Sequence, residues 1–137
     1  MKGDELMQLS KFTDYTFRVL IYMGTHEDEL CTVERLAAKL EVSEHHLKKV
    51  IHKLAKTDYL ISTKGRAGGV KLGLPPEEIN LGDILKITEE NLYIVDCLKT
   101  QLTCGFISKE CKLKGIINQS LEKFIEEFSK YTLKDIL

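Results

Sequence analysis

The chain of 137 residues is long enough for one domain with an appendage, and its 43% hydrophobic and 30% charged residues describe an ordinary globular protein. This composition excludes a disordered tail, a collagen-like repeat and a disulfide-dense mini-protein. The formal net charge of −1 by itself argues weakly against nucleic acid as the partner, because phosphate binding usually needs surplus positive charge.

The N-terminal residues contain no apolar segment typical of a secretory signal, and the longest apolar run, Val19 to Met23, is far too short to span a bilayer. We therefore expect a cytoplasmic protein that does not cross a membrane. The four cysteines should then be reduced thiols rather than disulfides.

The first part of the chain predicts two helices. An amphipathic helix is expected over residues 12–26, with Gly24 marking its end. A short second helix should run from Val33 to Leu40, with Thr32 as its N-cap.

A third helix is predicted after a tight turn at Glu41-Val42. Ser43 is a good N-cap for a helix from Glu44 to Lys56. The apolar side chains of this segment recur at helical spacing, at Leu47, Val50, Ile51 and Leu54.

Two short strands follow, Tyr59 to Thr63 and Val70 to Gly73, joined by the glycine-rich segment Lys64 to Gly69. Helix, turn, helix and then a hairpin is the order of a winged helix-turn-helix. The expected fold is therefore mostly α with a small β-hairpin: a winged helix-turn-helix over residues 7–80.

Residues 81–137 are expected to form a second region, separate from the winged helix-turn-helix. A short helix is predicted at 81–88 and a long amphipathic helix over Lys112 to Lys130. The apolar stripe of the long helix is suited to dimerisation with a second copy, although folding back onto its own core is the alternative.

The charge is unevenly distributed along the chain. Residues 43–72 contain seven basic and two acidic side chains, so this segment carries +5 and the remainder −6. A basic face on an acidic body fits phosphate binding by one side of the protein. The alternatives are a solvated lysine face, or a winged helix that contacts only proteins.

Candidate DNA-binding residues come from the start of the third helix and from the hairpin tip. In a winged helix-turn-helix the N-terminal residues of the recognition helix reach base edges in the major groove, and an arginine at a hairpin tip suits a narrow minor groove. The candidates are Ser43, Glu44, His45, His46, Lys48, Lys49, Lys64 and Arg66.

Three cysteines are grouped as C-x6-C-x6-C at Cys97, Cys104 and Cys111, whereas Cys31 stands apart. Thiolates favour zinc, copper(I) and iron–sulfur clusters, and these wide gaps disfavour zinc. An iron–sulfur cluster is one interpretation. A thiol redox switch without metal and ordinary core cysteines are the others.

Several segments together resemble the NsrR family of bacterial nitric-oxide-sensing repressors, which share a winged-helix superfamily with the iron–sulfur regulator IscR. The resemblance extends over nearly the whole chain from Met7. Its motifs are Met7 to Tyr15, Arg18 to Met23, Gly65 to Gly73, Leu81 to Ile84, the three-cysteine segment with Cys111 to Lys114, and Tyr131 to Asp135.

The resemblance implies a homodimeric repressor with an iron–sulfur cluster, [4Fe-4S] or [2Fe-2S], held by Cys97, Cys104 and Cys111. Asp14 matches the aspartate with which the N-terminal helix of the other subunit completes such a site. It also implies binding to a double-stranded DNA operator, with nitric oxide as the effector that releases the DNA.

Two departures concern the cysteine segment. The second gap has six residues where the family commonly has five, and Glu110 stands in place of the usual proline. IscR-like members have a ligand histidine three residues after the last cysteine, where this chain has Lys114. The lysine in place of a ligand histidine favours the NsrR-like interpretation over the IscR-like one.

Other functions remain open. A regulator of the same superfamily that senses iron, cluster supply or thiol oxidation is the main alternative, and a winged-helix interaction module that binds no DNA is another. An enzyme is not expected, because the sequence has no nucleophile–base pair, phosphate loop or catalytic histidine motif.

Overall fold

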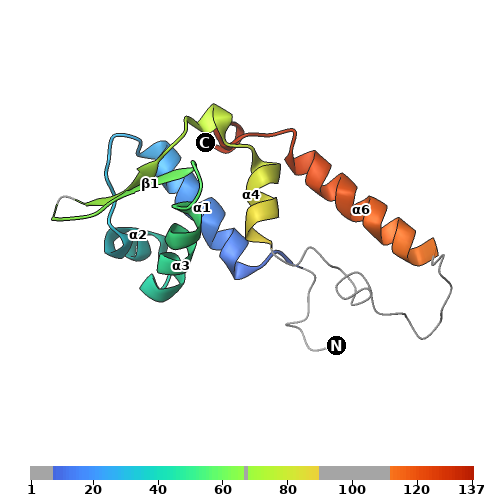
Figure 1. Cartoon of the computed structure of the whole chain (residues 1–137), viewed down its shortest axis with the longest axis horizontal. Coiled ribbons are helices and arrows are strands. Elements are labelled where there is room, and N and C mark those ends of the chain that lie inside the picture. Colours follow the sequence, from blue (N-terminus) through green and yellow to red (C-terminus); the bar gives the residue numbers. More distant parts are fainter. Residues whose placement is uncertain (1–7, 67, 90–111) are drawn as a thin grey trace.

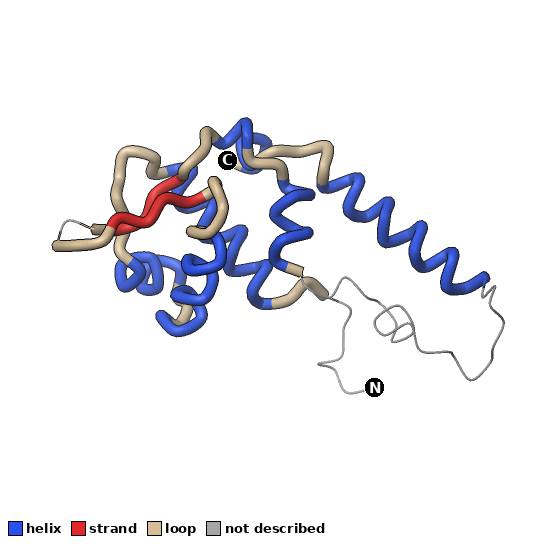
Figure 2. Tube along the Cα trace, in the orientation of Figure 1, coloured by secondary structure: helices blue, strands red, loops and turns tan. Residues whose placement is uncertain are grey.

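The computed structural model describes residues 8–66, 68–89 and 112–137. In chain order the elements are α1 (Lys11–Thr25), α2 (Val33–Leu40), α3 (Glu44–Leu54), β1 (Leu60–Thr63), β2 (Gly69–Leu72), the 3-10 helix η1 (Pro76–Glu78), α4 (Leu81–Thr88), α6 (Lys112–Phe128) and the 3-10 helix η2 (Leu133–Ile136). The helices α1 to α4 and the hairpin form one body, from which α6 extends (Figures 1 and 2). The predicted winged helix-turn-helix is confirmed.

The helix-turn-helix is built by local capping. The Thr32 hydroxyl accepts from the backbone N–H of Arg35 at 3.2 Å and so begins α2. Glu41 ends α2 in the left-handed region with φ 54°, and the N–H of Val42 donates to the carbonyl of Ala37 at 3.1 Å. This is the tight turn that the sequence predicts.

Some predicted helix ends differ from the structure by one or two residues. Helix α3 ends at Leu54 rather than Lys56, because the Thr57 hydroxyl donates to the Leu54 carbonyl at 2.5 Å and replaces the next helical bond. The first helix, expected over residues 12–26, is displaced by one residue at each end, and it ends at Thr25, directly after Gly24. A Cβ at Gly24 would lie 2.8 Å from Leu137, so the glycine makes room for the chain's last side chain.

The wing is an antiparallel hairpin in which Leu60 pairs with Leu72 and Thr63 with Gly69. Each strand lies within one residue of its predicted bounds. At the tip Gly65 has φ 111°, a conformation that side chains disfavour. Near the tip, β2 is joined to the segment before α2 by two backbone hydrogen bonds between Cys31 and Val70, of 2.7 and 3.0 Å.

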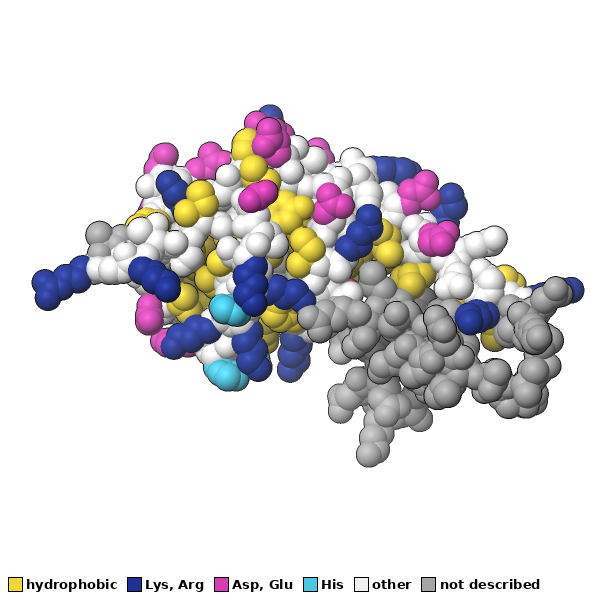
Figure 3. All heavy atoms as spheres, viewed as in Figure 1, with side chains coloured by type: hydrophobic (Ala, Val, Ile, Leu, Met, Phe, Trp, Pro, Cys, Tyr) yellow, Lys and Arg dark blue, Asp and Glu magenta, His cyan; other side chains and the backbone are white. Residues whose placement is uncertain are grey.

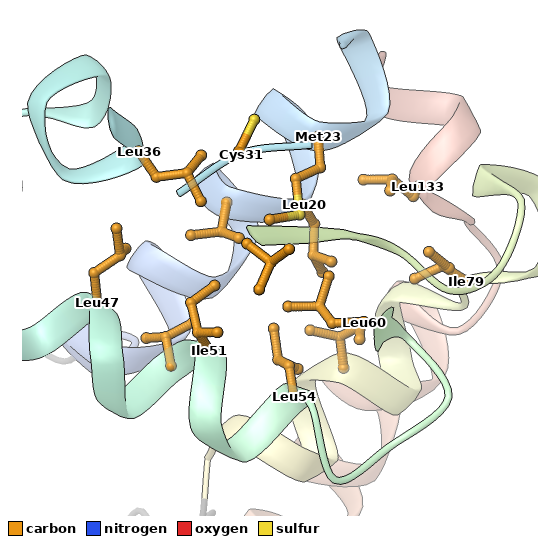
Figure 4. Packing of buried hydrophobic residues seen from close by; sticks show 14 of the residues in the cluster. Leu20, Met23, Cys31, Leu36, Leu47, Ile51, Leu54, Leu60, Ile79 and Leu133 are labelled. Carbon is orange, nitrogen blue, oxygen red and sulfur yellow. The ribbon is translucent and has the colours of Figure 1, made fainter. Parts of the chain in front are cut away.

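One hydrophobic core joins the helix-turn-helix to the C-terminal residues (Figure 4). Leu20, Leu54 and Leu60 are fully buried at its centre. At the far side Leu133 is also buried, and its N–H donates to the Ile79 carbonyl at 2.8 Å. The C-terminal residues therefore stabilise the body that holds the recognition helix.

Helix α6 has no buried residue along its length. It ends at Phe128, before the predicted Lys130, because the Asn80 side chain donates to the Ser129 carbonyl at 2.8 Å and turns the chain back toward α4. Leu113 is 63% exposed and Phe124 is 42% exposed. Among the described residues the apolar stripe of α6 is divided: Leu113, Ile116 and Phe124 are exposed, whereas Phe128 packs against the core and the Phe17 ring. None of the helices in the described ranges is long and apolar enough to cross a membrane.

Candidate functional site

Helix α3 separates into a buried and an exposed face. Its apolar side chains pack inward, and Leu47, Val50 and Leu54 are fully buried. The residues predicted to face DNA are all exposed: Ser43, Glu44, His45, His46, Lys48 and Lys49. The structure thus presents the predicted side chains together at one surface.

The start of α3 is also fixed by contacts with α1. Ser43 caps the helix by accepting from the N–H of His46 at 3.3 Å, and its Oγ lies 3.0 Å from Nδ1 of the same residue. The ring of Tyr15 lies 5.9 Å from the His46 ring. In the last turn of α3, the Lys53 ammonium lies 5.5 Å above the centre of the Phe12 ring. Helix α1 therefore contacts α3 at both ends.

The wing adds cationic side chains beside α3. Lys64 and Arg66 are exposed at the hairpin tip, and Lys71 is exposed on β2. Figure 3 shows a group of Lys and Arg side chains over α3 and the wing, while many of the Asp and Glu side chains of this view lie along the upper edge. The two-sided distribution agrees with the charge arithmetic from the sequence and gives the protein one face suited to phosphates.

The proposed cofactor ligands are only partly within the described residues. Cys97, Cys104 and Cys111 lie outside them, so the structure says nothing about their arrangement. Across residues 8–66, 68–89 and 112–137, no group of three or more His, Cys, Asp or Glu side chains is placed to hold a metal ion. The cluster expected from the sequence therefore stays a prediction.

Asp14 is within the described residues and is accessible. It lies in the first turn of α1 with about half of its side chain exposed. Arg18 faces both carboxylate oxygens, with Nε donating to Oδ1 at 3.2 Å and Nη2 lying 3.1 Å from Oδ2. Exposed ion pairs contribute roughly 0.2–1 kcal/mol, so a metal ligand role can displace this one. Asp14 therefore presents an accessible oxygen ligand, whereas the cysteines that would join it lie outside the described residues.

The fourth cysteine has a different role. Cys31 is fully buried in the core, and burial, followed by the Glu29 carboxylate, raises the pKa of its thiol. The thiolate is the form that binds metals, so a buried thiol with a raised pKa is a poor ligand. Cys31 packs the core beneath the wing.

Sequence reasoning missed two groups of contacts at this site. The contact of the Tyr15 ring with His46 joins two helices, and the periodicity of the first helix alone does not predict it. A polar network of Ser10, Thr13, Thr88 and Glu89 joins the start of α1 to the end of α4. A threonine on an apolar helix face is a weak signal for such a network, and its partners lie too far along the chain to be found by local patterns.

A recognition helix with a basic face, a preceding helix and turn, and a basic wing together define a winged helix-turn-helix DNA-binding regulator. A profile of the Rrf2 family, described as iron-dependent transcriptional regulators, matches residues 9–137. The chain belongs to the Rrf2 family.

Relatives agree with this assignment. The transcriptional regulator NsrR of Halalkalibacterium halodurans is 38% identical over 96% of this chain and 90% of its own. NsrR of Bacillus subtilis is 36% identical over the same shares. These relatives are regulators rather than enzymes.

Solved structures share the fold at lower identity. CymR, the global cysteine regulator of Bacillus subtilis, superposes with a TM-score of 0.73 at 22% identity, covering 96% of each chain. IscR of T. potens gives a TM-score of 0.74 at 20% identity, covering 95% of this chain and 85% of its own.

Proposed function

We propose that the protein is a homodimeric repressor that holds an iron–sulfur cluster and releases operator DNA in response to nitric oxide. The observation that carries the proposal is the accessible Asp14 carboxylate on the helix that contacts the recognition helix. The high coverage of relatives named NsrR supports the same assignment.

The second copy is proposed to bind along α6. Leu113, Ile116 and Phe124 are exposed on this helix, and a helix with such a stripe stabilises a closed dimer when it packs on its symmetry mate. The dimer would place two recognition helices on one DNA duplex. Half-sites one helical turn apart require a separation of about 34–36 Å between them.

In this proposal Cys97, Cys104 and Cys111 hold the cluster of one subunit, and Asp14 of the partner subunit completes the ligand set. When bound, the cluster supplies iron that nitric oxide can reach. A released Asp14 carboxylate returns to Arg18, with which it pairs within one chain.

The position of α1 then determines the position of α3. Ligation of Asp14 holds the first turn of α1 toward the other subunit, and Tyr15 and Phe12 hold α3 against the same helix. Release of the carboxylate removes that constraint, so the two recognition helices lose their common spacing. The ligated form is the one that binds DNA.

The test compares two cysteine variants with the wild-type protein, each purified without oxygen. Cys104→Ala should lose iron, sulfide and the visible absorbance, and should bind operator DNA weakly. Cys31→Ala is the matched control, because it removes a buried thiol of the core and should keep both the cluster and DNA binding.

A Cys104→Ala protein that binds DNA as tightly as wild type and stays regulated contradicts the proposal. A colourless wild-type protein with stoichiometric zinc also contradicts it. The family description as iron-dependent favours one other candidate, a regulator that senses iron supply. In that case iron chelators release DNA, whereas nitric oxide does not.

A further inference from the structure

Glu89 follows the last residue of α4, and its carboxylate caps the start of α1. Its Oε1 accepts from the backbone N–H of Ser10 at 2.6 Å and lies 2.7 Å from the Thr13 hydroxyl. Ser10 is the N-cap of α1, so the carboxylate faces the positive end of the helix dipole. Two hydrogen bonds and the dipole thus hold this one oxygen at the start of α1.

The Thr13 hydroxyl is the centre of the network. It is fully buried and lies within 2.8 Å of the Thr88 hydroxyl, which is only 4% exposed. A hydroxyl has one proton to donate, and the ionised Glu89 carboxylate is the stronger acceptor. The Thr13 oxygen then accepts from Ser10, whose Oγ lies 3.1 Å away. We call Ser10, Thr13, Thr88 and Glu89 the clamp.

The clamp lies between the two parts of the proposed sensor. Thr13 directly precedes Asp14, and Glu89 precedes residues 90–111, in which the three cysteines stand. The clamp itself consists wholly of described residues. It ties the chain just before the cysteine-containing segment to the helix turn that carries Asp14.

The first turn of α1, which carries Thr13, also contacts the recognition helix α3. Phe12 contacts Lys53 and Tyr15 contacts His46, at 5.5 and 5.9 Å. Because α1 is one continuous hydrogen-bonded helix from Lys11 to Thr25, its first turn moves as a unit. A displacement at Thr13 therefore displaces Tyr15 and acts on His46.

We propose that Glu89 is a positioning residue that, through Thr13, sets the orientation of α1 against the recognition helix and couples the cofactor site to DNA binding. The coupling rests on the proposed function; the mechanical link from Glu89 to His46 does not. Loss of the clamp leaves the ligands in place and weakens their influence on α3, because α1 is then no longer held in one orientation.

The first experiment uses the full chain in its cluster-free form and needs no cofactor. The His46 ring resonances are recorded by NMR in wild type, Glu89→Ala and Glu89→Gln. Glu89→Ala should shift them, because the ring current of Tyr15 acts on His46 from a changed position. Glu89→Gln keeps a side-chain acceptor for Ser10 and Thr13 and should largely restore the wild-type shifts.

Two further variants complete this experiment. Glu78→Gln removes an exposed carboxylate on η1 and should leave the His46 resonances unchanged. Thr13→Val removes the hydroxyl but keeps the branched shape, so it tests the link even where Glu89→Ala unfolds. Unchanged His46 resonances in the folded Glu89→Ala and Thr13→Val proteins overturn the proposal.

The second experiment measures operator affinity with and without the cluster. In the wild-type protein the ratio of the two affinities should lie between about 5 and 150, the range usual for coupled sites. In Glu89→Ala the ratio should fall toward one while the iron and sulfide content stays unchanged. A wild-type ratio in Glu89→Ala overturns the coupling. A ratio of one in wild type instead overturns the proposed function, while the His46 shifts still decide the mechanical link.

Discussion

The ring of Tyr15 in α1 lies 5.9 Å from the ring of His46 in α3, centroid to centroid, with the planes inclined by 38°. His46 is the third residue of the recognition helix, and its Nδ1 also lies 3.0 Å from the Ser43 hydroxyl. Tyr15 follows Asp14 directly. The helix that carries the proposed ligand therefore touches the end of α3 that we expect to face DNA.

Replacing Tyr15 by alanine should weaken operator binding while leaving the fold intact. A ring pair of this kind contributes about 0.5–1.5 kcal/mol, which corresponds to roughly a 2- to 10-fold loss of affinity. Fluorescence anisotropy with operator DNA measures the loss, and circular dichroism checks the fold. Tyr15→Phe keeps the ring and should bind nearly as wild type. Equal affinity of the alanine variant would show that the contact does not position α3.

The cationic side chains of α3 and the wing should determine how binding depends on salt. For each phosphate contact removed, the slope of log affinity against log salt should fall by about 0.9. We expect this for Lys48→Ala, Lys49→Ala, Lys64→Ala and Arg66→Ala, titrated from low to high salt. Lys86→Ala on α4, whose partner is Asp83 at 3.8 Å, is the control. A slope unchanged by all four substitutions contradicts this DNA interface.

The stripe on α6 should hold the dimer together. Leu113→Glu and Phe124→Glu place a charge on this exposed apolar face and should convert the dimer to a monomer, because burying an unpaired carboxylate is costly. Asn118→Glu adds the same charge at an exposed position of α6 that is turned away from Leu113, Ile116 and Phe124, and should leave the dimer intact. Sedimentation velocity distinguishes the two states. Persistence of the dimer in both stripe variants would place the interface elsewhere.

Gly82 should be needed where α4 meets the end of α6. A Cβ at this position would collide with the side chain of Ser129, and such overpacking typically costs about 1–3 kcal/mol. Gly82→Ala should therefore lower the free energy of unfolding in urea. Gly115→Ala is the matched helical control, since its Cβ meets open space among the described residues; it should stabilise by up to about 1 kcal/mol. Equal effects of the two substitutions would argue against this close approach.

Local patterns were sufficient for the helix-turn-helix. The spacing of Leu47, Val50 and Leu54 and the caps Thr32 and Ser43 predict α2 and α3 because each signal acts within a few residues. The exposed face of α3 follows from the same periodicity. The glycine-rich segment between two short expected strands likewise predicts the wing.

Contacts between distant segments could not be predicted in this way. Gly24 resembles a helix end because glycine usually marks one, yet here it accommodates Leu137 from the end of the chain. Thr13 resembles an ordinary polar interruption of an apolar face, and only the folded chain brings Glu89 to it. Such long-range pairings depend on the tertiary arrangement, and they are the contacts on which our account of signalling depends.

The most direct test of that account is a titration of the cluster-loaded protein with nitric oxide under anaerobic conditions. Visible absorbance and anisotropy of a bound operator fragment are recorded on the same sample. We predict that DNA is released in step with the absorbance change, and that an iron chelator below the level that bleaches the protein releases none. DNA that stays bound while nitric oxide changes the absorbance completely would contradict the central claim.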